Sequence, residues 1–323
     1  MKPITLLALV FTLLPAQERP RFSTNVQLVM VDAQVTEKNT GKILELLSPN
    51  DFEVYEDGRR CEIREFQFET TPLDVVFLTY AKSGWGPAKD INDFRRGLNL
   101  APAELRATDR GAVLRTDSAS KVDLQMTDDL EKVRHALVFG TPHIPTGHDH
   151  LYDATRVATT LFPRPKDRTR RRSILAITDD IERGSKCTLA QLITELLEAD
   201  ATLHVVNVVL GKQGAREIGI GGGRIPRIGR EIGRARTGGT LRDAVEATGG
   251  EAIPGDLFQE RLPELIRRMR LRYLFGFYAS PTRQREYRTI DVRLSPEARK
   301  RYPNALVRAR RGYYAAPAGS GVD

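Results

Sequence analysis

A cluster of histidine and aspartate residues is the part of this sequence whose side chains could bind a transition metal. The stretch TPHIPTGHDHLYD places three imidazoles beside two carboxylates, namely His143, His148, His150, Asp149 and Asp153. Imidazole and carboxylate groups are ligands that zinc and its neighbours take in proteins. The spacing fits no zinc signature, and loop histidines beside polar residues are more often simply exposed. Two alternatives therefore stay open for this loop, a metal site and an exposed polar turn.

Motifs for catalysis are missing from the sequence. It contains no G-x-S-x-G nucleophile elbow, no H-E-x-x-H helix and no phosphate-binding P-loop. The run GGGR at 221–224 follows no phosphate-binding template, and acidic pairs such as Asp179-Asp180 occur in any charged protein. We therefore expect a protein that is not an enzyme, with a hydrolase built on an unrecognised constellation as the alternative.

The composition is that of a soluble globular protein. The chain has 323 residues, of which 40% are hydrophobic and 28% charged, and its formal net charge is +8. A chain of this length can form one large domain or two of ordinary size. The positive balance favours acidic partners such as anionic polysaccharides or lipid headgroups.

The N-terminal segment MKPITLLALVFTLLPAQ has the layout of a secretory signal peptide. We expect residues 1–16 to be removed after Ala16 and the mature chain to be exported, to the periplasm or outside the cell. Nucleic acid is then the least natural acidic partner. No other stretch reaches the roughly 20 apolar residues that a transmembrane helix needs. In an oxidising compartment Cys61 and Cys187 either pair or remain two buried thiols.

Both ends of the chain have the pattern of β-strands. Residues 22–71 contain the alternating runs VQLVMVDAQV and NDFEVYEDGRRCEIREF, in which Asp57-Gly58 predicts a tight hairpin. Residues 273–315 contain YLFGFYAS, YRTIDVRL and ALVRARRGYYA. The N-terminal part alone has too few strands to bury both its faces. We therefore expect the two ends to form one small β-sandwich.

The middle of the chain, residues 73–272, alternates between buried strands and helices. The apolar runs LDVVFLTY, GAVLR, SILAIT and LHVVNVVL predict strands that are buried on both faces. Helical patterns occur in DDLEKVRHALVF, LYDATRVATTLF and TLAQLITELLEA, with Asp128 and Thr188 as predicted N-caps. This alternation predicts a doubly wound, mostly parallel α/β domain with any site at the carboxyl ends of its strands.

Two arginine-rich segments fall outside this plan. The run RPKDRTRRR at Arg164–Arg172 precedes a buried strand, and we expect it to be a solvated loop. The long Gly/Arg-rich stretch at 211–239 separates a strand from the next helix. Loops of that length are usually functional or disordered.

The order of several segments also carries a family resemblance. These are VQLVMVDAQV, NDFEVYEDG, LDVVFLTYAKSG, LQMTDDLEKVRHAL, HLYDATRVA, SILAITDD, VEATGGEA and LRYLFGFY followed by VRARRGYYA. Together they resemble the von Willebrand factor A-related proteins common in acidobacterial genomes, over nearly the whole mature chain. The resemblance implies a von Willebrand factor A-like domain inserted into the β-sandwich. It also implies a metal-ion-dependent adhesion site, in which D-x-S-x-S, a Thr and an Asp hold one Mg²⁺.

The metal motif of that family is degenerate in this chain. Where the family has D-x-S-x-S, the chain has Thr79, Ala81 and Ser83 at the ligand positions. A hydroxyl therefore replaces the first carboxylate, and a methyl replaces the first serine hydroxyl. Lys82 adds a positive charge that would oppose a divalent ion.

The other two ligand positions of the motif are acidic in this chain. The Thr of the second loop falls at Asp149, and Asp179 matches the last acidic position. Ser83, Asp149 and Asp179 are thus candidate ligands of a site that binds Mg²⁺ weakly or not at all. In the alternative, Asp179 only accepts hydrogen bonds from loop amides.

The function that we expect is binding of a protein or polymer, an adhesion-type role, through the carboxyl ends of the strands. A tryptophan there would supply a large contact area. The residues expected on this binding face are Thr79, Lys82, Trp85, Thr146, His148 and Asp180. The alternative function is electrostatic attachment to an anionic surface or polysaccharide through the arginine-rich segments. Salt distinguishes the two, because it weakens a charge-driven contact more than a packed one.

Overall fold

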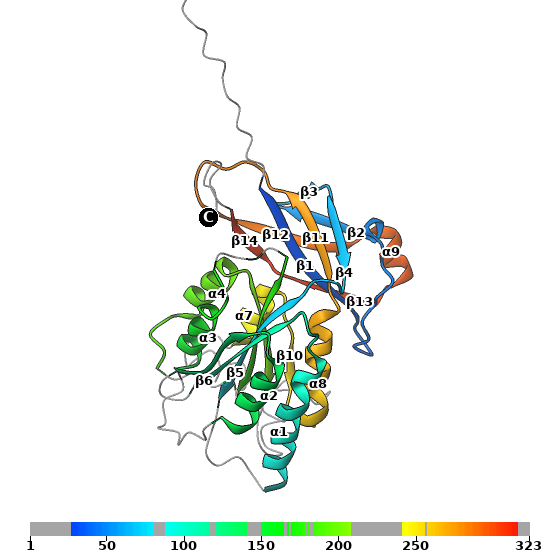
Figure 1. The fold of residues 1–323 in the computed structure, drawn as a ribbon. Helices are drawn as coiled ribbons and strands as arrows, with labels where there is room; N and C mark the ends of the chain where they lie inside the picture. Colours follow the sequence, from blue (N-terminus) through cyan, green and yellow to red (C-terminus); the bar gives the residue numbers. More distant parts are fainter. Residues whose placement is uncertain are drawn as a thin grey trace, which may run out of the picture.

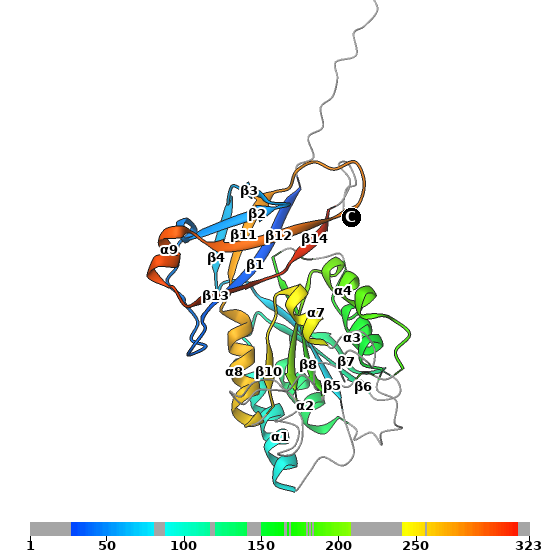
Figure 2. The ribbon, with the colours of Figure 1, turned by 180° about the vertical axis from the view of Figure 1, so that it is seen from behind.

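A computed structural model shows a mixed α/β protein with one mostly parallel sheet and two antiparallel sheets (Figures 1 and 2). This confirms the α/β class and the mostly parallel sheet. The structure describes residues 27–80, 88–116, 120–140, 150–164, 167, 169–178, 180, 182, 184–207, 241–255 and 257–315. The predicted signal peptide and the 211–239 loop lie outside the described residues.

The mostly parallel sheet has six strands in the order β10-β9-β8-β5-β6-β7. All neighbours are parallel except β7, which runs antiparallel to β6. The strands are β5 (Leu73–Tyr80), β6 (Arg110–Thr116), β7 (Ser120–Thr127), β8 (Arg171–Thr178), β9 (Ala201–Asn207) and β10 (Ala252–Pro254).

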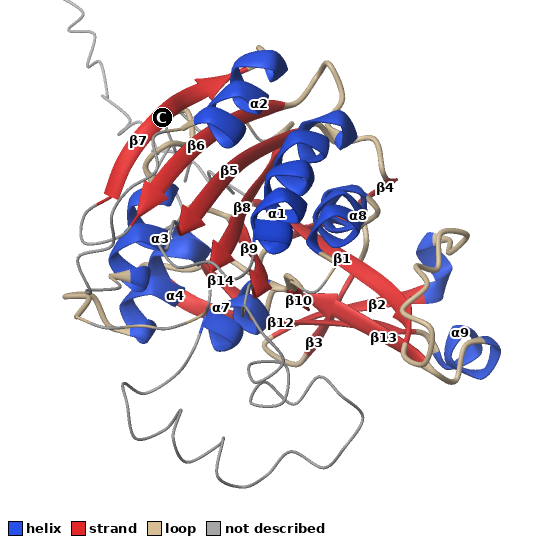
Figure 3. Cartoon of the chain, turned by 90° about the horizontal axis from the view of Figure 1, so that it is seen from below, coloured by secondary structure: helices blue, strands red, loops and turns tan. Residues whose placement is uncertain are grey.

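Helices cover both faces of this sheet (Figure 3). Alternate residues of β5 point to opposite faces, so Val75 and Phe77 join one core cluster and Val76 and Leu78 the other. One face is covered by α1 (Ala88–Leu100), α2 (Leu130–Phe139) and α8 (Phe258–Arg270), with the short 3-10 helix at Ala101–Glu104. The other face is covered by α3 (Leu151–Thr159), α4 (Leu189–Glu198) and α7 (Leu241–Thr248).

The two antiparallel sheets take their strands from both ends of the chain. One has the order β13-β1-β11-β4 and the other β14-β12-β2-β3. Their strands are β1 (Leu28–Glu37), β2 (Phe52–Glu56), β3 (Arg59–Cys61), β4 (Glu65–Phe68), β11 (Tyr273–Tyr278), β12 (Glu286–Leu294), β13 (Ala305–Ala309) and β14 (Gly312–Ala315). A 3-10 helix at Pro49–Asp51 precedes β2, and α9 (Pro296–Arg301) follows β12.

Strands from the two ends pair directly and share one hydrophobic core. Leu28 lies opposite Tyr278 in the β1–β11 ladder, and the ladder between β2 and β12 joins the ends a second time. Between the sheets, the Phe52 ring packs against Tyr273 and Phe275 with centroid distances of 5.0 and 4.8 Å. Neither end would bury these rings without the other.

The predicted hairpin at Asp57-Gly58 is present between β2 and β3. Asp57 has φ 47° and Gly58 has φ 76°. A tight turn of this kind needs positive φ at both central residues, which aspartate tolerates and glycine adopts at no steric cost.

The antiparallel sheets lie against the amino-terminal ends of the parallel strands. Arg171 at the start of β8 pairs with Asp32 of β1. Asp200, just before β9, pairs with Arg310, which follows β13. The carboxyl ends of the parallel strands therefore face away from the antiparallel sheets (Figure 1).

Several local predictions need correction. The strand β7 was not predicted, because it is a half-exposed edge strand without a continuous apolar run. The N-cap of α2 is Asp129 rather than Asp128, since the Asp129 carboxylate accepts the Lys132 N–H at 3.1 Å. Thr188 is the N-cap of α4, as predicted.

The two cysteines do not pair in the structure. Cys61 is half-buried in β3 and Cys187 is buried just before α4, and both are free thiols. Burial raises the pKa of the Cys187 thiol to about 11, with the Asp153 carboxylate adding to the shift. A thiol with so high a pKa is almost wholly protonated and therefore unreactive near neutral pH.

Candidate functional site

The carboxyl ends of the parallel strands hold the residues that the sequence singles out, and only some of them are described. Thr79, at the end of β5, is buried, and its hydroxyl has no hydrogen-bond partner among the described residues. Asp180 follows β8. The remaining predicted residues lie outside the described residues: Lys82, Ser83, Trp85, Thr146, His148, Asp149 and Asp179, together with His143 of the histidine loop.

Asp180 connects the end of β8 to the beginning of α7. Its carboxylate accepts a hydrogen bond from the backbone N–H of Leu241, the first residue of α7, at 3.1 Å. Its own N–H donates to the Thr178 hydroxyl at 3.1 Å, and its φ of 55° lies in the left-handed region. Aspartate tolerates this conformation better than most residues. Asp180 thus anchors a helix start to a strand end.

Glu182 and Ser185 cap the beginning of α3 in a similar way. The N–H of Tyr152 donates to the Glu182 carboxylate at 2.8 Å and lies 3.1 Å from the Ser185 hydroxyl. Ser185 in turn donates its own N–H to Glu182 at 2.8 Å. Sequence reasoning missed both residues, because the chain positions that they cap are 30 residues or more away.

Asp153 holds the other side of the same junction. Its carboxylate accepts the N–H groups of Lys186 and Cys187 at 2.8 and 3.0 Å. Burial alone would raise the pKa of Asp153, but these two amides outweigh it and lower the pKa. The carboxylate therefore stays ionised and engaged with the backbone.

The described part of the chain contains no cluster of side chains that could coordinate a metal ion. No group of three or more His, Cys, Asp or Glu side chains there could hold an ion. His150 lies at the N-cap of α3 without a side-chain capping bond. Asp153 accepts hydrogen bonds from the Lys186 and Cys187 amides, and the remaining members of the predicted magnesium and zinc sets lie outside the described residues, so both sites stay predictions.

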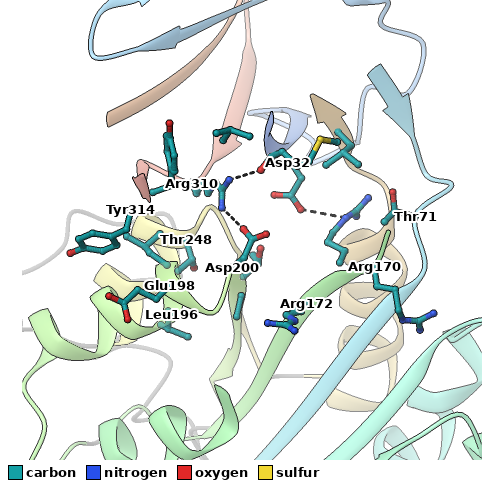
Figure 4. A pocket seen from close by; sticks show the side chains of 18 of the residues that line it. Asp32, Thr71, Arg170, Arg172, Leu196, Glu198, Asp200, Thr248, Arg310 and Tyr314 are labelled. Carbon is teal, nitrogen blue, oxygen red and sulfur yellow. Dashed lines mark hydrogen bonds and ion pairs between the residues drawn. The ribbon is translucent and has the colours of Figure 1, made fainter. Parts of the chain in front are cut away.

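A pocket lies at the opposite edge of the sheet, between the antiparallel sheets and the parallel one (Figure 4). Its volume is about 450 Å³. Residues from β1, β8, α4 and β14, and from the segments before β9 and between β13 and β14, line it, including Met30, Asp32, Leu196, Asp200, Arg310 and Tyr314. This is within the usual size of small-molecule pockets, which are often found between domains.

Asp32 and the buried Arg171 line this pocket, and the buried Arg272 contacts Asp32 from outside the lining. The Asp32 carboxylate lies 3.0 Å from the Arg272 Nε and 3.4 Å from the Arg171 Nε. Burial would raise the pKa of Asp32, but the charges of Arg272 and Arg171 overcome this and lower it. The same burial lowers the pKa of the Arg171 guanidinium to about 10.

The described end of the Arg164–Arg172 run contradicts the prediction of a solvated loop. Arg170 donates to Asp74 at 2.7 Å and to two backbone carbonyls. Arg171 and Arg172 begin β8, are buried, and donate to carbonyl oxygens of α8 and of the residues that flank α4 and α3. The prediction was wrong for these three residues, most of whose partners are distant in sequence, whereas Arg164, Asp167 and Thr169 are exposed as expected.

Comparisons with known proteins give only weak likenesses. No protein-family model and no curated protein matches this chain. Among solved structures, an aerotolerance-related membrane protein from Bacteroides fragilis is 13% identical with a TM-score of 0.44, and BatB from Bacteroides thetaiotaomicron is 14% identical with a TM-score of 0.42. Each alignment covers 61% of this chain, and 100% and 98% of the respective neighbour.

A third solved structure, proximal thread matrix protein 1 from the mussel byssus, is 11% identical with a TM-score of 0.44. It is aligned over 67% of this chain and 50% of its own length. At these scores the three structures say nothing about the function of this chain.

Proposed function

We propose that the protein is an exported, non-enzymatic binding module that recognises a protein or polymer through the carboxyl ends of its parallel strands. In this proposal the parallel sheet belongs to a von Willebrand factor A-like domain of the acidobacterial type, inserted into a β-sandwich built from both chain ends. The observation that carries the proposal is the position of the antiparallel sheets. They cover the amino-terminal edge of the parallel sheet and lie away from its carboxyl edge.

The described acidic residues at this edge support binding rather than catalysis. Asp180, Glu182 and Asp153 each accept hydrogen bonds from backbone N–H groups. For Asp153 the donating amides lower the pKa, so its carboxylate favours the charged form and is a poor proton acceptor. Together the three carboxylates fix the loops that lead to α3, α4 and α7. A surface that is already fixed loses less conformational entropy when it binds a partner.

Magnesium has a minor part in this proposal. The buried Thr79 hydroxyl stands where the family has a carboxylate, so it brings no charge to an ion. Ser83, Asp149 and Asp179 stay the proposed ligands, and with so few of them Mg²⁺ would bind weakly. Affinity for the partner would then depend on shape, hydrogen bonds and the Trp85 side chain.

Electrostatic attachment receives no support from Arg170, Arg171 and Arg172, whereas Arg164, at the start of the same run, is exposed and remains available for it. Arg170 is paired with Asp74, and Arg171 with Asp32. Arg172 donates to two carbonyl oxygens inside the protein. None of the three presents a free charge to a surface.

The proposal is tested by capture of partners from the native envelope fraction with the immobilised mature chain. Wild type is compared with a Trp85→Ala, Lys82→Glu double variant and with Arg293→Gln, which changes an exposed residue of β12. We expect a partner that stays bound in about 0.5 M NaCl, where the screening length is only a few ångströms, and that the double variant alone loses. A partner that the double variant retains would refute the proposed face, and one released from wild type by salt would favour electrostatic attachment.

A further inference from the structure

The pocket between the antiparallel and parallel sheets has an excess of positive charge. Five arginines line it against three carboxylates, as Arg170, Arg171, Arg172, Arg285 and Arg310 face Asp32, Glu198 and Asp200. In addition, Asp32 is shared between Arg171 and the fully buried Arg272. Cationic side chains that are held together in a partly enclosed space attract an anion strongly, because water screens them poorly there.

Two of these arginines also have donors without partners among the described residues. Arg171 is only 8% exposed; its Nη1 donates to the carbonyls of Met269 and Arg270, while its Nη2 has no hydrogen-bond partner in the described part of the chain. The Nε of Arg310 is likewise without a partner there, although its Nη atoms donate to Asp200 and to the Met30 carbonyl. Buried donors of this kind are costly unless something accepts from them.

The remaining wall of the pocket is largely apolar. It includes Leu28, Met30, Leu196 and Leu274, and Tyr314 lies at one side (Figure 4). Such a wall suits the body of an organic molecule better than a fully hydrated inorganic ion.

We infer that this pocket binds a small organic anion whose carboxylate or phosphate group is held by Arg171 and Arg310 and whose apolar body packs along the leucines. The oxyanion would accept charge-assisted hydrogen bonds from these guanidinium donors, which are shorter and stronger than bonds between neutral groups. This site is separate from the proposed partner-binding edge, because it lies at the other end of the parallel strands. It adds a small-molecule ligand to a protein proposed to bind macromolecules.

Calorimetric titration of the mature chain tests this inference. The probes are phenyl phosphate and benzoate. Inorganic phosphate is the control ligand without an apolar body, and sodium chloride at matched ionic strength is the control for a general salt effect. We expect saturable one-to-one binding of phenyl phosphate or benzoate, weaker binding of inorganic phosphate and none of chloride. No binding of either organic anion at millimolar concentration would overturn the inference, and equal affinity for inorganic phosphate would overturn the role of the apolar wall.

A matched pair of surface variants shows where the ligand binds. Arg285 lies at the pocket, 4.5 Å above the Tyr314 ring and paired with Glu198, and its side chain is 55% exposed. Arg293 has the same surroundings elsewhere, 4.9 Å above Tyr55 and paired with Asp291, at 52% exposure. We expect Arg285→Gln to weaken binding about two- to threefold, as an exposed charge does, and Arg293→Gln to leave it unchanged.

Inside the pocket the effect should be larger. Arg310→Gln removes a donor that contacts the ligand, so affinity should fall about tenfold. Circular dichroism checks that Arg310→Gln is folded. If it is not, the comparison of Arg285→Gln with Arg293→Gln still tests the site. Equal weakening in Arg285→Gln and Arg293→Gln would show a general ionic effect and refute the site.

Discussion

At the scale of single residues, the imidazole of His204 should make the stability of the protein sensitive to acid. It is completely buried in β9, where its Nδ1 accepts the Glu251 N–H at 3.2 Å. Burial, with the nearby positive charge of Arg272, lowers the pKa of His204 to about 3. The unfolded chain therefore takes up a proton near pH 6.5, whereas the folded protein does not.

This pKa difference predicts a loss of stability that begins near pH 6.5 and continues to about pH 3. In that window the free energy of unfolding should fall by up to about 1.4 kcal/mol per pH unit, because only the unfolded state protonates His204. The pKa values of Asp32 and Glu251 are also lowered in the folded protein, so their protonation in the unfolded state reduces stability further. This second loss begins only below about pH 4.5, where unfolded carboxylates become protonated. Urea titrations at about pH 7, 6 and 5 measure the slope.

The control compares two histidine variants. In His204→Asn the amide oxygen can accept from Glu251, and the variant has no titrating group at this position, so the slope should decrease. His135→Asn, at an exposed position of α2, should keep the slope of wild type. An unchanged slope in His204→Asn would show that another group is responsible.

A second prediction at this scale concerns magnesium. Under the proposed resemblance, millimolar Mg²⁺ should raise the melting temperature little or not at all relative to a chelator, because Thr79 and Ala81 occupy two ligand positions of the adhesion motif. Thermal unfolding of wild type and Asp179→Ala measures this. If Mg²⁺ clearly raised the melting temperature of wild type and Asp179→Ala abolished the rise, metal-dependent adhesion would become the favoured function.

At the scale of secondary structure, the start of α2 offers a sharp test because two adjacent aspartates differ in role. Asp129 accepts the Lys132 N–H, and the hydrogen bond lowers the pKa of Asp129. Asp129→Ala should therefore lower the midpoint of urea unfolding, as the loss of an N-cap does. Asp128→Ala, one residue earlier, should cost much less in the same urea titration. Equal costs would mean that the capping bond contributes nothing.

Strands that are buried on both faces were the easiest elements to predict. The runs of β5, β6, β8 and β9 are short and almost continuously apolar, and a run of this kind is typical of a strand in the interior of a sheet. The edge strand β7 has no such run, since one side of it is solvated.

The residues of the candidate site were harder to predict. Arg171 looks like part of a solvated charged run in sequence, yet its partner Asp32 lies far away in β1. Glu182 and Ser185 are loop residues with no local signal, and their role depends on the distant start of α3. Periodicity reports burial along one element, but it does not show which elements meet.

At the scale of the whole molecule, the contact between Asp32 and the arginines joins the two parts of the protein. Asp32 belongs to β1 and Arg171 to β8, while Arg272 lies just before β11. Asp32→Asn leaves the two buried arginines without their carboxylate, which should cost about 3–5 kcal/mol. Calorimetry should show one unfolding transition in wild type and two in this variant.

The control for this prediction is Asp291→Asn, which also breaks a pair with arginine but at an exposed site. It should cost less than about 1 kcal/mol and keep the single transition. If Asp32→Asn behaved like Asp291→Asn, the buried network would not couple the two parts.

The pairing of β1 with β11 and β13 also affects the order in which the chain can fold. Leu28 meets Tyr278, and Ala33 meets Ala309, so β1 has neither neighbour until almost the whole chain has been made. Contacts between such distant residues form slowly, and unpaired apolar strands aggregate readily. A chain cut short after α8 would keep the helices and strands of the parallel sheet and expose β1. The closing strands thus make solubility depend on completion of synthesis.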